Sequence, residues 1–270
     1  MVELVEKIMC PNCGAPLKIK AGEIVVTCEY CGTAVNLKAE TPFVLKHSII
    51  PNNFSEEKIG QVVRSWMRSG FTMPQNLSQK AVILESRLVF LPFYVLTAHA
   101  VTEYEGIFTR TGQETPVKDT LSRDYQRTIL GRRSTQFPEQ EYKIPLSGKS
   151  SFDLSRVQGE FLNAELDEGE AVERGKSEIE THQLYLIKEK IDKISASSTD
   201  ISVDSCEFLH APVWFVDYEY EGVRYTIILD GATGEIITGE IPVKQSSFSW
   251  IWVAAIILII LIILFRFILS

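Results

Sequence analysis

The 270-residue sequence is poor in basic side chains and in cysteine. It has 27 Lys and Arg against 35 Asp and Glu, and this acidic balance argues against a general nucleic-acid binder, which usually presents a basic surface. Five cysteines are too few for a secreted scaffold held by disulfides. With 23% charged and 45% hydrophobic residues, the composition is that of a globular protein, which excludes a wholly disordered or collagen-like chain.

The sequence also lacks the motifs that most often carry catalysis. It contains no G-x-S-x-G, and its histidines do not have H-E-x-x-H or H-x-E spacing. The four histidines are His47, His99, His182 and His210. Residues 147–150 resemble the end of a phosphate-binding loop, but Lys143 stands where that loop requires glycine. We therefore predict no enzyme. We interpret His99, His210 and Cys206 as structural residues, although both histidines lie on or beside predicted strands and could approach each other.

Four of the cysteines form two closely spaced pairs near the N-terminus. They are Cys10, Cys13, Cys28 and Cys31. Two residues separate the members of each pair, which lets both thiolates of one tight turn reach the same ion. Residues 17–20 and 24–27 are predicted strands around a turn at 21–23, so a hairpin should bring one pair to the other.

Four thiolates fill the tetrahedral coordination shell of Zn²⁺ and leave no position for water or substrate. We therefore predict a structural zinc site, whose metal contributes to folding. The alternatives are iron in the same ligand set, two disulfides, or free thiols. The text CPNCGAPL…CEYCGT resembles the zinc-ribbon family, including the ribbons of transcription factor IIB-type and rubredoxin-like proteins, over roughly 40 residues. This resemblance implies a small three-stranded sheet and a pair of metal knuckles, but no substrate.

Zinc ribbons contact either nucleic acid or protein, and charge helps to decide between the two. Residues 1–48 contain five Lys and five Glu, so no basic cluster is available to displace counterions from phosphates. We therefore expect protein contact or a purely structural role for this ribbon, with nucleic-acid binding as the alternative.

The soluble body is predicted over 49–243. A helix is expected at 53–70, with a cap within residues 53–56 and an apolar stripe of Ile59, Val62, Val63, Trp66 and Met67. A second helix is expected at 168–192, with Asp167 and Glu170 in capping-box spacing. Predicted strands cover 81–106, 201–209, 212–220, 223–230 and 235–241. Pro92 should restrict its strand to an edge or a bulge.

The body contains one weak internal sequence repeat, which we call the internal echo. LPFYVLTAHAVTEYEG at 91–106 is similar to APVWFVDYEYEG at 211–222, and a predicted helix precedes each segment. This predicts two helix-plus-antiparallel-meander units, over 49–150 and 151–243. The second unit, with its DGATGEI turn, resembles PepSY-like modules. The whole layout resembles a group of prokaryotic proteins that join a CPNCG…CEYCG ribbon to such a body, a resemblance that implies no particular activity.

Charge is distributed unevenly along the body. Residues 58–149 carry 13 basic and 8 acidic side chains, whereas 150–243 carry 7 basic and 20 acidic ones. One interpretation is a basic face toward anionic lipid or another anion, and the other is that the two halves neutralise each other across their interface.

The C-terminus holds a 16-residue run without charge, at 250–265. With its flanks it reaches about 22 residues, or about 33 Å as a helix, enough for a hydrocarbon core of about 30 Å. We predict a linker at 244–249 and a transmembrane tail anchor at 250–269; a buried core helix is the alternative. No signal peptide is evident and the thiols should stay reduced, so we expect a single-pass protein of the cell membrane with its body in the cytoplasm.

The sequence as a whole predicts an α+β protein with an N-terminal four-cysteine zinc ribbon at 1–48, two helix-plus-meander units and one C-terminal transmembrane helix. Its predicted function is that of an adaptor or scaffold without catalysis, with the lipid bilayer and a second protein as partners. The alternative is a membrane-tethered nucleic-acid-binding or transcription-related factor, in which the basic 110–133 region contacts phosphates. A third hypothesis is an enzyme built around His99 or His210.

Overall fold

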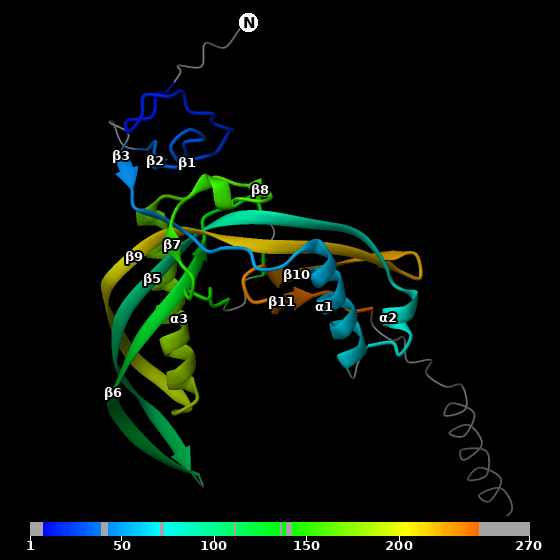
Figure 1. Cartoon of the computed structure of the whole chain (residues 1–270). Coiled ribbons are helices and arrows are strands. Elements are labelled where there is room, and N and C mark those ends of the chain that lie inside the picture. The colour runs from blue at the N-terminus through cyan, green and yellow to red at the C-terminus, as the bar shows by residue number, and fades with distance from the viewer. Residues whose placement is uncertain are drawn as a thin grey trace, which may run out of the picture.

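The computed structural model describes residues 8–242, except 39–42, 71–72, 111, 136 and 139–141. Its described part contains a small and a large sheet together with three α-helices (Figure 1). The small antiparallel sheet consists of β1 (Val25–Thr27), β2 (Ala34–Asn36) and β3 (Phe43–Leu45), in that order. It gives the cysteine segment a three-stranded sheet, but residues 17–20 are not a strand, contrary to the predicted hairpin.

Two very long strands form the centre of the large sheet. β5 (Val82–Arg110) and β9 (Lys193–Tyr220) pair antiparallel along almost their whole length and bend at one end (Figure 1). β6 (Gln113–Leu130) pairs with β5, while β10 (Val223–Asp230) and then β11 (Ile236–Gly239) continue the sheet beyond β9. The short strands are β4 (His47–Ile49), β7 (Ser150–Ser151) and β8 (Glu160–Phe161). The helices are α1 (Glu56–Ser69), α2 (Leu77–Lys80) and α3 (Glu168–Lys188), with a 3₁₀ turn at Leu154–Arg156.

The internal echo of the sequence has a structural counterpart at the middle of this strand pair. Leu91 of β5 lies opposite Ala211 of β9, and these are the first residues of the two echoing segments. β8 pairs in parallel with β5 just before Leu91, and β4 pairs in parallel with β9 just before Ala211. The elements β4–α1–β5–β6 and β8–α3–β9–β10 therefore occupy matching positions around an approximate two-fold axis at this pair.

The backbone bonds of the two units match in the same way. The Gly131 amide donates to the Pro92 carbonyl, and the Gly231 amide donates to the Pro212 carbonyl, both at 2.8 Å. Both positions are crowded, because an added Cβ would lie 3.1 Å from the Pro92 oxygen at Gly131 and 2.8 Å from the Pro212 Cβ at Gly231. The backbone amide of Asn53, three residues before the start of α1, donates to the Gly231 carbonyl. The backbone amide of Glu165, three residues before the start of α3, donates to the Gly131 carbonyl. Each helix thus begins against the meander of the other unit.

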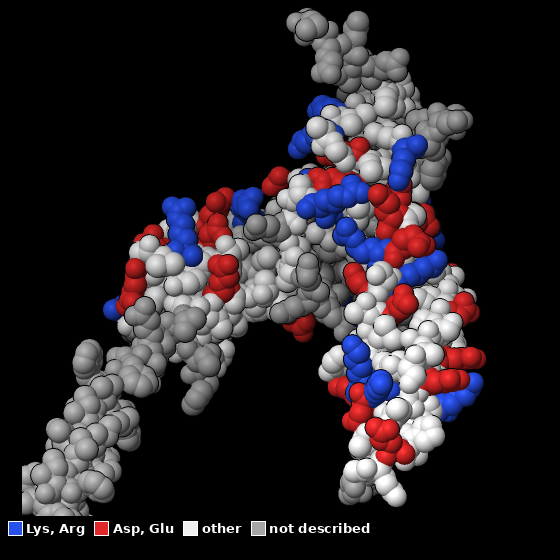
Figure 2. Space-filling view, turned by 180° about the vertical axis from the view of Figure 1, so that it is seen from behind, with Lys and Arg blue, Asp and Glu red and all other residues white. Residues whose placement is uncertain are grey.

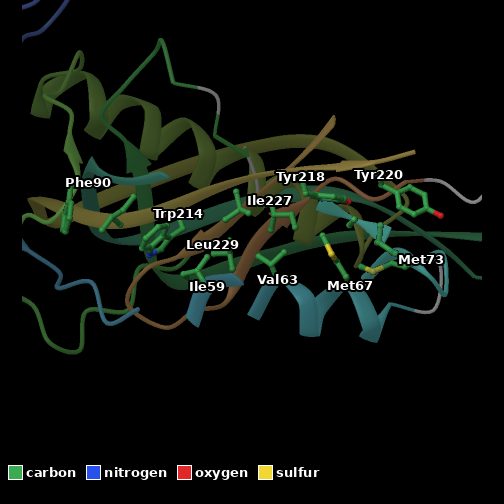
Figure 3. Packing of buried hydrophobic residues seen from close by; sticks show 14 of the residues in the cluster. Ile59, Val63, Met67, Met73, Phe90, Trp214, Tyr218, Tyr220, Ile227 and Leu229 are labelled. Carbon is green, nitrogen blue, oxygen red and sulfur yellow. The ribbon is translucent and has the colours of Figure 1, made fainter. Parts of the chain in front are cut away.

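α1 covers one end of the large sheet. Its N-cap is Ser55, whose side chain accepts from the Lys58 amide. The predicted apolar stripe is confirmed, with Ile59, Val63 and Met67 buried. Figure 3 shows this stripe pointing toward side chains of β9 and β10, among them Trp214, Tyr218, Ile227 and Leu229.

α3 packs against the other end of the sheet, where β6, β5 and β9 form a curved three-stranded arm. The predicted capping box is present, since Asp167 accepts from the Glu170 amide and Glu170 accepts from the Asp167 amide. The helix ends at residue 188, earlier than predicted. Gly175 permits close packing, because a Cβ there would lie 2.5 Å from Leu96 Cδ2 of β5.

Several strand predictions differ from the structure. Residues 193–220 form one strand rather than two, and 113–130, where no strand was predicted, form β6. Pro92 lies in a central strand, neither at an edge nor at a register shift of the pairing with β9, contrary to the prediction of an edge or a bulge. On the side of β5 opposite β9, β8 pairs only as far as Phe90 and β6 begins to pair at Phe93. Pro92 lies in the gap between these two partners, so its missing N–H costs no hydrogen bond to a neighbouring strand.

Among the residues described, no helix is long and apolar enough to cross a membrane. The 250–265 run, the predicted anchor at 250–269 and the linker at 244–249 lie outside them. The tail anchor therefore stays a prediction.

Candidate metal centre and its junction with the body

The four cysteine side chains of the N-terminal segment converge on one point. Their Sγ atoms all lie within 4.8 Å of one another, and these residues are Cys10, Cys13, Cys28 and Cys31. The Sγ atoms of Cys10 and Cys31 are 3.7 Å apart, as are those of Cys13 and Cys28. A disulfide would hold these atoms at about 2 Å, whereas a tetrahedral ion with bonds of about 2.3 Å to sulfur spaces its ligands by about 3.8 Å. The cluster therefore fits a metal ion and not a pair of disulfides.

Two equivalent knuckles hold the thiols in place. The Gly14 amide donates to the Cys10 carbonyl at 2.8 Å, and the Gly32 amide donates to the Cys28 carbonyl at 2.9 Å. Both glycines have positive φ, +72° and +71°, which a side chain would disfavour. The two C-x-x-C-G segments thus adopt the same turn and present both pairs of sulfurs to a common centre.

The pKa values of the thiols are shifted in different directions. Desolvation opposes ionisation of Cys31, but hydrogen bonds with Thr33 and Asn12 outweigh it and lower the pKa of this thiol to about 6. At Cys13 a backbone hydrogen bond opposes the change, but desolvation and the neighbouring thiols raise the pKa to about 12. Crowded thiols of this kind lose their protons when a cation binds, so metal affinity should fall in acid.

The small sheet is joined to the body by backbone bonds. The Ile24 and Val25 amides donate to the Ala164 carbonyl, and the Ala164 amide donates back to the Val25 carbonyl. The Asn163 side chain accepts from the Thr27 amide at 2.9 Å. Lys38 pairs with Asp167, the N-cap of α3, at 2.6 Å. The metal knuckles are therefore attached to the residues that lead into α3.

A buried histidine pair forms a second junction. His47 Nε2 lies 2.7 Å from His210 Nδ1, and the far side of each ring faces a carbonyl. His210 Nε2 is 2.9 Å from the Leu162 oxygen, and His47 Nδ1 is 3.4 Å from the oxygen of Gly32 in the second knuckle. Phe152 stacks on His47 and Phe161 stacks on His210, with ring centroids 4.0 and 4.1 Å apart.

The hydrogen bonds assign the protons of this pair. Both carbonyls only accept, and the Leu162 oxygen makes the shorter contact, so in a neutral pair the proton is assigned to His210 Nε2, whose Nδ1 then accepts from His47 Nε2–H. His47 Nδ1 is then unprotonated and faces the Gly32 oxygen across the longest of the three contacts. Burial lowers the pKa of His47 to about 4, and burial with the neighbouring ring lowers that of His210 well below its usual value. The pair is therefore neutral at physiological pH.

The other histidines and Cys206 have separate surroundings. His99 does not meet His210; its Nδ1 lies 2.6 Å from an Asp124 carboxylate oxygen. His182 contacts the Tyr125 hydroxyl at 3.1 Å. Burial raises the pKa of Cys206 to about 12, in keeping with a core thiol. The pairing of His47 with His210 carries no sequence signal, because these residues are 163 positions apart and belong to no spaced motif.

Charges of the two halves of the body pair with each other. Arg132 bonds Glu165 at 2.8 Å, Arg133 bonds Glu170 at 2.7 Å, and Lys149 pairs with Glu207. Figure 2 shows basic and acidic side chains interspersed over the visible face rather than separated. These contacts support the interpretation that the basic and acidic halves neutralise each other.

No protein-family model, curated protein or solved structure matches the chain.

Proposed function

We propose that this chain is a zinc-ribbon adaptor or scaffold, held at a membrane by its C-terminal apolar run and binding a protein partner. The observation that carries the proposal is the cluster of four thiols, which by itself fills the coordination shell of one ion. A closed shell of sulfur ligands is typical of structural zinc. Zinc is proposed over iron because this spacing of cysteines and the two glycine knuckles resemble zinc ribbons.

The junctions between the small sheet and the body support a scaffold. A metal at the cysteine cluster would hold the two knuckles, and the small sheet that carries them is attached through Ala164 to the segment before α3. Metal binding would therefore order a surface made of both parts. The uncharged run at 250–265 supports a membrane location, with the body on the cytoplasmic side.

Charge favours a protein partner over nucleic acid. The chain has a formal net charge of −8. In the 110–133 region, which a nucleic-acid-binding factor would need, Lys118 and Arg132 already pair with carboxylates. Phosphate contacts would have to break these pairs, which reduces their contribution to binding.

The test uses the full-length chain expressed in its host. We expect about one zinc per chain, retention in the membrane pellet after alkaline carbonate extraction, and a specific protein recovered after cross-linking and nuclease treatment. A chain without metal, or one released into the supernatant, would contradict the proposal. Recovery of nucleic acid alone, lost as salt rises and weakened by Arg132→Ala with Arg133→Ala, would support the transcription-related alternative.

A further inference from the structure

A cleft of about 940 Å³ lies between α3, the end of β6 and the segment that follows β6. Its lining includes four consecutive β6 residues, Arg127–Leu130, and the flank of α3 that runs from Arg174 to Tyr185. Phe137 and Tyr142 also line it and lie against each other, with ring centroids 5.7 Å apart. The cleft thus has one strand wall, one helix wall and an aromatic end.

The strand wall is a free sheet edge. Successive side chains of a strand point to opposite faces, so four consecutive lining residues mean that the edge itself faces the cleft. In the described part of the chain, β5 is the only strand that pairs with β6. Along an antiparallel strand, alternate residues direct their N–H and C=O groups toward the neighbouring strand. Gly131 bonds toward β5 through Pro92, so Leu130 and Thr128, one and three residues earlier, direct their N–H and C=O groups away from β5. Backbone donors and acceptors are therefore offered toward the cleft.

The cleft is also basic. Among the described residues, the charged side chains of the lining are those of Arg127, Arg132, Arg133, Arg174 and Glu178. Glu165 and Glu170 pair with two of these arginines, and within this described set one positive charge remains in excess after all three glutamates are counted. Arg174 is exposed on α3, and Arg133 uses only two of its five N–H groups in bonds to residues 165 and 170. Guanidinium groups are therefore available to carboxylates that enter the cleft.

We propose that this cleft binds an extended acidic peptide, which adds as a strand to the free edge of β6. Main-chain bonds to Thr128 and Leu130 would give affinity, and acidic side chains on alternate residues would meet Arg174 and Arg133. An inorganic anion would use the arginines but leave the edge unpaired, which is why a peptide is the better match. The inference deepens the proposed adaptor function, because it gives the chemistry of the partner segment.

The probe is a labelled eight-residue peptide of alternating Glu and Val with blocked ends, added to the full-length protein in a non-ionic detergent. We expect saturable binding that weakens as salt rises. Arg174→Glu should weaken it by about tenfold or more. Lys176→Glu makes the same charge change on the same helix outside the cleft lining, and should alter affinity by less than about twofold.

The backbone contacts are tested separately. Thr128→Pro removes an N–H that faces the cleft and no ladder bond to β5, so it should abolish peptide binding while the far-ultraviolet circular dichroism is unchanged. If this variant does not fold, the Glu–Val peptide with N-methyl groups on alternate residues, added to the wild-type protein, makes the same test. Equal binding of the N-methylated peptide, or of a Lys–Val peptide, would overturn the proposal.

Other outcomes separate this inference from the adaptor function. If inorganic phosphate or vesicles of anionic lipid bind in an Arg174-dependent manner and the peptide does not, the cleft is an anion site and the peptide proposal is wrong. If Arg174→Glu leaves recovery of the cellular partner unchanged and does not affect the peptide, the adaptor stands and the cleft is not its site. If the peptide binds as expected but no cellular partner is recovered, the cleft proposal stands and the adaptor function fails.

Discussion

Replacing His47 with glutamine should remove part of the acid sensitivity of the fold. His47 is neutral in the native protein, with a pKa of about 4, whereas in the unfolded chain it titrates near 6.5. The unfolded state therefore binds the proton more readily, so the stability that this group contributes is complete above pH 6.5 and is lost as the pH falls toward 4. The two pKa values correspond to about 3 kcal/mol in all, of which about 2 kcal/mol is lost by about pH 5.

The measurement is denaturant unfolding of the full-length protein at about pH 7.5 and about pH 5 with zinc present, followed by tryptophan fluorescence. His47→Gln is expected to lose about 2 kcal/mol less than the wild type between these values. Protonation of the thiolates affects both proteins and cancels in the difference. His99→Gln, at a half-exposed position away from the pair, should keep the full acid loss. The same loss in the wild type and in His47→Gln would refute the assignment of a neutral buried pair.

Other perturbations test the metal centre and the packing. A chelator, or Cys28→Ser, should remove the metal and abolish amide protection across residues 8–38, as measured by hydrogen exchange; protection that persists without metal would contradict a metal-dependent ribbon. Gly175→Val should lower the free energy of unfolding by about 1–3 kcal/mol in denaturant, because its Cβ would overlap a β5 side chain. Ile59→Ala should cost about 2–5 kcal/mol beneath the sheet, while Gln61→Ala on the exposed side of α1 should stay within about 0.5 kcal/mol; equal costs would refute the packing of α1.

Local sequence signals were sufficient for α1, for α3 and for part of the metal site, but not for the short α2. The cap within residues 53–56 and the Asp167–Glu170 box depend only on neighbouring residues, so both helix starts could be predicted, that of α1 to within three residues. The spacing of the cysteines fixed the ligands for the same reason, since each knuckle is closed by its own glycine, Gly14 or Gly32.

Features that depend on distant contacts were not predictable. Most side chains of β6 between 113 and 124 are exposed on both faces of the arm, so the alternation that marks a half-buried strand is absent. Residues 193–205 are similar, with small polar side chains along a mostly exposed end of β9. His47 and His210 meet only because β4 pairs in parallel with β9. The cleft requires α3 to lie beside β6, which no local pattern encodes.

The pairing of β5 with β9 also shapes how the chain must fold during synthesis. Leu91 can pair with Ala211 only after more than one hundred further residues have been synthesised. At about 5–20 residues per second, a ribosome needs on the order of ten seconds for that stretch, during which the apolar middle of β5 lacks β9 and has only β6, and later β8, as strand partners among the described elements. Such long-range closure slows folding and exposes aggregation-prone surface. A nascent chain of this protein should therefore depend on chaperones until its second half has emerged.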